Sequence, residues 1–290
     1  MCDQLSREIL KEGDTADIYT GIYNDRTVQA NQKSVVVKHV MPNYANHKSK
    51  FILWLGACAQ NRTRFIHPNI CPLLGVMYTG KLEPLLVYDH HSGGNLLEYL
   101  RVKGQSLLFQ DKLRVMSGIL DALVRLHHEQ DIAWGDLHPG NIMLDESGNP
   151  KLCGLGPRPS LQHEAASKSD LSAIRYFGPE RYRAEDTLLE KAGDVWAFGC
   201  LIVKVGSKDP HENDDTFFED SQILNGRDPY QEARTAYGVI QAVTSGRWPY
   251  EKSDCDNLPL WNMASACWIE SVLQRPMTTS LVRRIETLQT

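Results

Sequence analysis

The chain has 290 residues, of which 42% are hydrophobic, and its 31 basic and 36 acidic side chains give a formal net charge of −5. These values exclude disordered, collagen-like and fibrous proteins, and the acidic balance argues against a nucleic-acid-binding or polybasic membrane surface. No run of 18 apolar residues is present, so we expect no membrane-spanning segment. The length fits one two-lobed domain.

The start of the chain and its cysteines predict the compartment. Asp3, Arg7 and Glu8 interrupt the first residues, so we expect no secretory signal. The seven cysteines are an odd number and form no CxxC pair, which predicts reduced thiols. A cytoplasmic or nuclear protein is therefore expected.

The first ninety residues indicate strands and the remainder indicates helices. Residues 34–40 and 85–88 are short β-branched or apolar runs, and the second ends at a flexible junction, 92–94. Apolar residues then recur every three to four positions, which predicts amphipathic helices at 111–127 and 281–288. The segment 195–205 is apolar on most faces, which predicts a helix deep in the core.

One segment, 208–225, is strongly acidic. It contains six acids and one lysine, a net charge of −5. A solvated surface loop is the plain interpretation, and an insert that docks a partner is the alternative.

The stretch from Trp134 to Asn141 carries the chemistry. An aspartate, Asp136, and an amide, Asn141, lie five residues apart on a Gly/Pro-rich loop, just before a hairpin signal at 145–149. An acid and an amide so placed can hold a hydroxyl proton and a divalent cation side by side. Turn formation alone would also account for both residues.

Further motifs surround this loop, and together they resemble a eukaryotic protein kinase domain from about Leu10 to Leu288. The late C-W and R-P pairs are typical of tyrosine and tyrosine-kinase-like members. In chain order the matching segments are Lys38, Tyr88–His91, Leu126–His127, Trp134–Asn141, Gly178–Glu180, Asp194–Gly199, Cys267–Trp268 and Arg275–Pro276.

The resemblance implies an α+β, bilobal protein kinase fold. Residues 1–88 would form a small β-rich N-lobe with one main helix, and 89–290 the hinge and a larger, mostly helical C-lobe. It also implies a buried ion pair between Glu180 and Arg275, and hydrogen bonds from catalytic-loop amides to Asp194.

The resemblance also implies roles for the site residues. Asp136 and Lys38 would be catalytic, and Asn141 would bind a metal ion. Lys38 would also contact the nucleotide. The other residues expected to contact ATP are Gly13, Ile18, Val36, Tyr88, Asp89, His91 and Met143.

Three catalytic parts depart from the family pattern. At the glycine positions of the phosphate-covering loop only Gly13 matches. Cys58 stands where the glutamate partner of the strand lysine is expected, and no Asp or Glu occurs from Arg26 to Leu82. Gly154 stands where the principal magnesium ligand is expected, and glycine has no ligand atom. Loss of the metal ligand and of the lysine's glutamate partner together should slow phosphoryl transfer by roughly a hundredfold to ten-thousandfold or more.

These departures favour a degenerate, pseudokinase-like member that acts as a binding or allosteric module. ATP would bind weakly or not at all, and Mg²⁺ would not bind tightly. The alternative is an active Ser/Thr or Tyr kinase of the tyrosine-kinase-like group that uses Lys38, Asp136 and Asn141; a kinase-fold enzyme with a different transferase chemistry also stays open. The expected partner is a protein, as binding partner or substrate, and neither nucleic acid nor a membrane.

Overall fold

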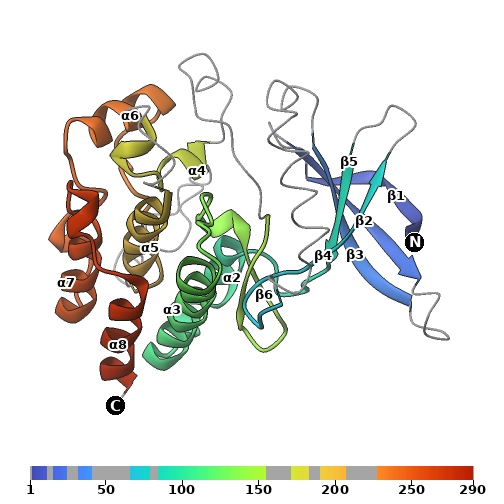
Figure 1. Ribbon diagram of the computed structural model, residues 1–290, viewed down its shortest axis with the longest axis horizontal. Helices are drawn as coiled ribbons and strands as arrows, with labels where there is room; N and C mark the ends of the chain where they lie inside the picture. Colours follow the sequence, from blue (N-terminus) through green and yellow to red (C-terminus); the bar gives the residue numbers. More distant parts are fainter. Residues whose placement is uncertain are drawn as a thin grey trace, which may run out of the picture.

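The protein has two lobes in the computed structural model (Figure 1). An antiparallel sheet that carries the N-terminus forms one lobe, and helices that lead to the C-terminus form the other. The structure describes residues 2–11, 16–24, 32–40, 66–78, 84–154, 171–182, 190–206 and 227–289. The predicted bilobal α+β architecture is confirmed.

The N-lobe sheet has five strands in the spatial order β1-β2-β3-β5-β4, and all neighbouring strands are antiparallel. The runs predicted at 34–40 and 85–88 lie inside two of these strands, where β-branched residues pack well on a pleated surface. The strands are β1 (Cys2–Lys11), β2 (Ala16–Asn24), β3 (Gln32–Val40), β4 (Leu73–Tyr78) and β5 (Pro84–Asp89).

The two faces of this sheet have different roles. Val36 pairs with Tyr88, and Lys38 pairs with both Ile18 and Leu86. Since paired residues share a face and side chains alternate along a strand, all five residues lie on one face. The opposite face packs its own apolar cluster, made of Val35, Val37, Leu85 and Val87.

The C-lobe contains seven α-helices among the described residues and a two-stranded hairpin. The helices are α2 (Leu96–Lys103), α3 (Phe109–Val124), α4 (Leu171–Ile174), α5 (Glu190–Gly206), α6 (Ala236–Thr244), α7 (Leu258–Cys267) and α8 (Thr278–Gln289). The hairpin pairs β6 (Ile142–Leu144) with β7 (Pro150–Leu152). Short 3₁₀ turns occupy Gly104–Ser106, Pro139–Asn141, Pro179–Tyr182, Lys252–Asp254 and Val272–Gln274.

The three helices predicted from the pattern of apolar residues are present. The helix expected at 111–127 is α3, which passes into a π-helical turn, Arg125–Glu129, that buries Leu126 and His127. Most of α5 is buried, as its apolar sequence predicted; it packs against α7 and α3, and α8 packs against α3. These helices form the largest apolar core of the described chain.

The lobes are connected where the chain approaches β4. The Cys71 N–H donates to the Leu152 carbonyl (2.9 Å), and the Leu152 N–H donates to the Asn69 carbonyl (2.8 Å). These bonds attach the end of β7 to the strand that enters the N-lobe sheet.

Two expectations lie outside the described residues: the main N-lobe helix, which would carry Cys58, and the acidic segment 208–225. Within the described part of the chain, no helix is both long and apolar enough to cross a membrane.

Candidate functional site

The loop between the π turn and β6 holds Asp136 and Asn141 in direct contact. The Asn141 Nδ2 group donates to the Asp136 carboxylate (2.5 Å) and to its main-chain carbonyl (3.2 Å). The His138 Nδ1 atom accepts from the Gly140 N–H (3.2 Å), which places the ring proton on Nε2, 3.8 Å from the other Asp136 oxygen. The loop therefore presents one oriented carboxylate that is 3% exposed.

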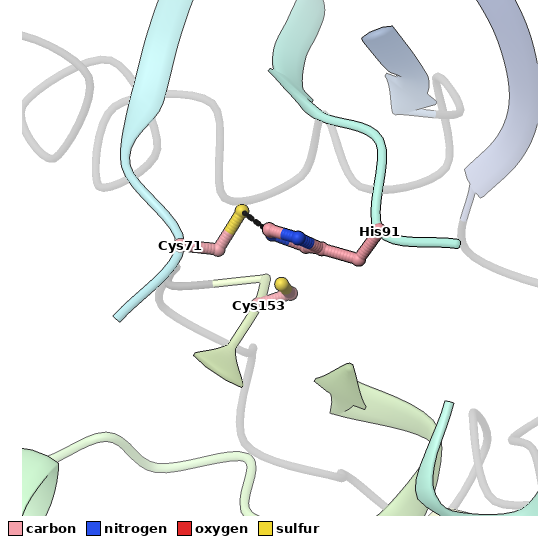
Figure 2. Close-up of side chains that lie close together, drawn as sticks. All are labelled: Cys71, His91 and Cys153. Carbon is pink, nitrogen blue, oxygen red and sulfur yellow. Dashed lines mark hydrogen bonds between the residues drawn. The ribbon is translucent and has the colours of Figure 1, made fainter. Parts of the chain in front are cut away.

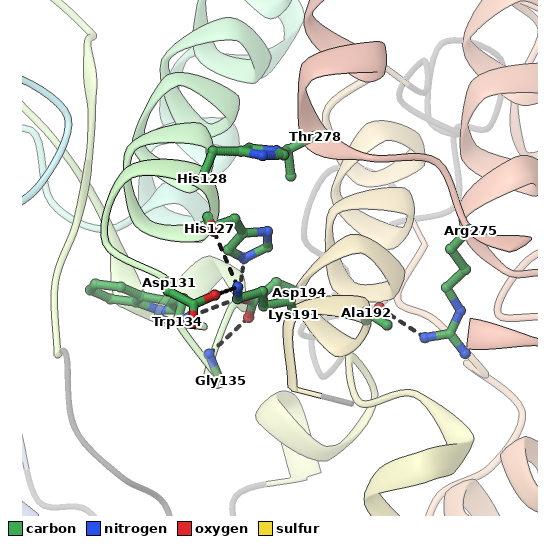
Figure 3. Close-up of polar contacts among 10 residues, drawn as sticks. All are labelled: His127, His128, Asp131, Trp134, Gly135, Lys191, Ala192, Asp194, Arg275 and Thr278. Atoms are coloured by element: carbon green, nitrogen blue, oxygen red, sulfur yellow. Dashed lines mark hydrogen bonds and ion pairs between the residues drawn. The ribbon is translucent and has the colours of Figure 1, made fainter. Parts of the chain in front are cut away.

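Asp194, in the first turns of α5, holds this loop in place through hydrogen bonds (Figure 3). Its two carboxylate oxygens accept the main-chain N–H groups of Trp134 (2.6 Å) and Gly135 (2.8 Å). His127 Nε2 donates to the same carboxylate at 2.8 Å. The predicted bonds from the loop amides to Asp194 are confirmed, and His127 is a partner that the sequence did not indicate.

The predicted buried pair of Glu180 and Arg275 is also present. The Arg275 guanidinium donates from Nη1 and Nη2 to the two Glu180 oxygens at 2.7 and 2.8 Å. It also donates to the carbonyls of Ile269 and Ala192 and lies 4.9 Å from the Trp196 ring centroid. Both charges are thus buried with their hydrogen bonds satisfied.

Gly154, two residues after β7, faces Asn141. It adopts a φ of +94°, and a Cβ placed on it would lie 3.3 Å from Asn141 Oδ1. A side chain at position 154 would therefore point at the Asn141 amide oxygen. The two positions form the frame of a two-ligand cation site, of which the chain supplies only Asn141.

Three side chains that are distant in the sequence converge near the hinge (Figure 2). Cys71, His91 and Cys153 bring their ligand atoms to within 4.8 Å of one another, and His91 Nε2 lies 3.4 Å from Cys71 Sγ. A hydrogen bond from the Cys153 thiol, aided by His91, lowers the pKa of Cys71 to about 6. Burial, followed by the neighbouring Cys71, raises the pKa of Cys153 well above its usual value.

The comparisons with known proteins decide the family. A family model described as protein tyrosine and serine/threonine kinase matches residues 5–285, nearly the whole chain. The chain belongs to the protein kinase family. The ordered motifs, the bilobal fold and the Asp136 loop agree with this membership.

Several curated plant and animal proteins are similar to the chain. Pollen receptor-like kinase 1 of Petunia integrifolia is 28% identical over 69% of this chain and 26% of its own length. U-box domain-containing protein 33 of Arabidopsis thaliana is 30% identical over 67% of this chain and 22% of its own length. MAP kinase kinase mkk-4 of Caenorhabditis elegans is 29% identical over 56% of this chain and 40% of its own length. The chain thus spans less than half of the length of each of these relatives.

The sheet face that packs against Cys71 carries four of the residues predicted to contact the nucleotide: Ile18, Val36, Lys38 and Tyr88. Met143 lies on the face of β6 opposite to the buried Ile142 and Leu144. Gly13 lies outside the described residues.

The side chains of Asp89 and His91 are engaged elsewhere. Val35 pairs with Asp89, on the face of the sheet away from Tyr88, and the Asp89 carboxylate forms an ion pair with Lys33 at 2.6 Å. His91 turns its ring toward Cys71. Neither the Asp89 carboxylate nor the His91 ring is directed at Lys38 or Asp136. Asp89 and His91 could therefore contact adenine only through their main-chain groups.

The pairing of β2 with β3 also shows which carboxylates could reach Lys38. Three carboxylates of the N-lobe are candidates to replace the family's glutamate beside Lys38: Asp14, Asp17 and Glu83. Asp17 pairs with His39, so its side chain lies on the face of the sheet opposite to Lys38. Asp14 and Glu83 lie outside the described residues.

The magnesium ion that this family uses does not fit the described residues well. Mg²⁺ requires octahedral oxygen coordination, normally with one or two carboxylates. Asn141 offers one neutral oxygen, Gly154 offers none, and the Asp136 carboxylate accepts from the Asn141 amide. The described residues therefore do not form a magnesium site of the family's kind.

The sequence did not indicate the cluster of Cys71, His91 and Cys153. Its members are 20 and 62 residues apart, unlike the short CxxC spacing that marks metal sites in sequences. The kinase motifs contained the one usable indication. They place Cys153 directly before Gly154 and His91 in the predicted hinge, so two residue types that bind metals stand at motif positions.

Proposed function

We propose that this kinase-family domain is a pseudokinase: a module that binds a protein partner and has little or no phosphotransferase activity. The observation that carries the proposal is the geometry at position 154. The backbone at position 154 would direct any side chain toward Asn141 Oδ1. Because the residue is glycine, no metal ligand is present there. The placement of Asp17 on the far face of the sheet from Lys38 adds support.

The second candidate is an active kinase of the tyrosine-kinase-like group. The specific observation in its favour is the Asp136 carboxylate, which is buried and accepts a hydrogen bond from Asn141. Asp194 holds the same loop through the main-chain N–H groups of Trp134 and Gly135. The late C-W and R-P motifs favour that group. Under either candidate, we propose a protein as the partner or substrate and the cytoplasm or nucleus as the location.

Phosphotransfer by the wild-type chain is expected to equal that of Asp136→Ala, because Gly154 offers no metal ligand and Cys58 replaces the glutamate that orients the strand lysine in the family. Restoring one part is expected to do little, since catalytic groups act as a unit. The double change Gly154→Asp with Cys58→Glu should exceed the product of the two single gains. It should still be slow, because an aspartate at a φ of +94° is strained by about 1–3 kcal/mol.

The measurement is single-turnover transfer from ATP to a generic protein substrate for all four forms, with Asp136→Ala as the blank. A wild-type rate far above this blank would contradict the pseudokinase proposal and favour the active kinase.

Nucleotide binding is expected to be weak and indifferent to magnesium, because Gly154 removes the group that couples the metal to the phosphates. At an ATP concentration near Kd the stabilisation is RT ln 2, about 0.4 kcal/mol, which raises Tm by about 1 °C. A thermal-shift titration with and without Mg²⁺ measures this, and Gly154→Asp is the matched variant that should gain magnesium dependence. A shift of several degrees in the wild type that requires Mg²⁺ is the contrary result.

A further inference from the structure

The cluster of Cys71, His91 and Cys153 contains two sulfur ligands and one nitrogen ligand that point toward a common centre (Figure 2). Cys71 precedes β4, His91 follows β5, and Cys153 follows β7. We propose that these three side chains bind a thiophilic metal ion, with Zn²⁺ as the best match, in the cleft beneath the hinge. This site is separate from the Asn141 and Gly154 positions of the kinase metal.

The distances fit a tetrahedral ion. Bonds of about 2.3 Å to sulfur and about 2.0 Å to nitrogen place the two sulfurs about 3.8 Å apart and each sulfur about 3.5 Å from the nitrogen. The observed separation of His91 Nε2 and Cys71 Sγ is 3.4 Å, and all three ligand atoms lie within 4.8 Å of one another. Shifts of about 1 Å or less therefore close the site around an ion.

The backbone holds the two cysteines in place before any ion binds. The Cys71 N–H donates to the Leu152 carbonyl (2.9 Å), and the Cys153 N–H donates to the Asn141 carbonyl (2.8 Å). Because neighbouring residues of the two segments are paired with each other, the two thiols face each other across a fixed gap. His91 lies on a separate segment, after β5.

Ligand chemistry and charge select the ion. Thiolate and imidazole ligands suit Zn²⁺ or Cu⁺ and are poor ligands for Mg²⁺. Two thiolates neutralise a divalent ion, so the complex brings no net charge into the apolar shell of Leu73, Leu86 and Tyr88 that surrounds Cys71. Three protein ligands leave the fourth tetrahedral position for water.

An ion bound here has a consequence for the cleft. Cys71 and His91 belong to the N-lobe and hinge, whereas Cys153 follows the C-lobe hairpin, so the ion would tie the lobes together. It would also occupy space next to Tyr88, on the sheet face predicted to receive adenine. This second consequence, exclusion of nucleotide, rests on the proposed function, while the metal site itself does not.

The test is titration of the reduced, metal-free chain with Co²⁺ and then with Zn²⁺ in competition with a chromophoric chelator. We expect one equivalent to bind with a sulfur-to-cobalt charge-transfer band. Cys71→Ser, Cys153→Ser and His91→Ala should each weaken Zn²⁺ binding by more than about a hundredfold. The matched controls are His90→Ala, an exposed neighbour, and Cys255→Ser, a buried thiol outside the cluster; both should bind as the wild type does.

The wild-type cobalt spectrum needs no variant, so it decides the proposal even if a variant fails to fold. Absence of the charge-transfer band from the reduced wild type overturns the proposal, whether or not the two cysteines form a disulfide in air. Equal Zn²⁺ affinity in the wild type and Cys71→Ser also overturns it. Competition between Zn²⁺ and a fluorescent ATP analogue tests the second consequence separately. Metal binding without loss of the bound analogue would support the metal site and contradict only the exclusion of nucleotide.

Discussion

Arg275→Ala is expected to lower the free energy of unfolding by about 3–5 kcal/mol, because it leaves the Glu180 carboxylate buried without its partner. Both side chains are buried, and the pair is bidentate, at 2.7 and 2.8 Å. Arg275 also satisfies the carbonyls of Ile269 and Ala192, which its removal would expose as unpaired acceptors. Urea-induced unfolding followed by tryptophan fluorescence and circular dichroism measures the change.

An exposed ion pair supplies the control for this prediction. Arg247 and Glu232 are both at least half exposed, so Arg247→Ala should cost about 0–1 kcal/mol. The double change Glu180→Leu with Arg275→Met should destabilise less than Arg275→Ala alone, because it leaves no unpaired buried charge. Equal losses from Arg275→Ala and Arg247→Ala would show that the buried pair does not stabilise the fold as described.

Asp194→Asn is expected to release the loop that carries Asp136. The carboxylate accepts three hydrogen bonds, from the main chains of Trp134 and Gly135 and from His127. An amide retains one acceptor oxygen and turns an NH₂ group toward donors, so at least one donor loses its partner. Because hydrogen bonds to a charged group are worth about 1.5–3 kcal/mol each, we expect a loss of about 3–5 kcal/mol.

Hydrogen exchange gives this prediction a local readout. The Gly135 and Trp134 amides should exchange faster in Asp194→Asn even below the unfolding transition. Asp131→Asn is the matched control: its carboxylate is exposed and pairs with Lys191, which lowers its pKa, and the loop amides should keep their protection. Unchanged protection of Gly135 in Asp194→Asn would contradict the assigned role of the carboxylate.

The residues that stabilise the kinase fold are retained in this chain, whereas a residue needed for catalysis is not. Asp194, Glu180 and Arg275 make the hydrogen bonds that the family pattern predicts, so the C-lobe retains these scaffold contacts. Position 154 retains the backbone direction of a metal ligand but not the ligand. Scaffold contacts stabilise any protein with this fold, whereas a metal ligand is needed only for phosphoryl transfer. This contrast is the physical basis of the pseudokinase proposal.

Local patterns in the sequence were sufficient for most of the fold. Helices α3 and α8 were predicted from apolar residues at a spacing of three to four, because that period places them on one face, and α5 from a segment that is apolar on most faces. The loop amides that donate to Asp194 and the pairing of Glu180 with Arg275 followed from the resemblance to kinases. The turn from α-helix to π-helix at Arg125, which buries His127 beside Asp194, carries no such period and was not predicted.

Tertiary structure alone decided which side chains meet. The register of β2 on β3 separates Asp17 from Lys38, because a shift of one residue moves a side chain to the other face of a sheet. Cys71, His91 and Cys153 come together only because β7 pairs with the segment before β4 while β5 ends beside both. The sequence determined the secondary structure elements and the motifs of a kinase, since these depend on neighbouring residues. The contacts that define the cleft depend on long-range strand pairing, which no short pattern encodes.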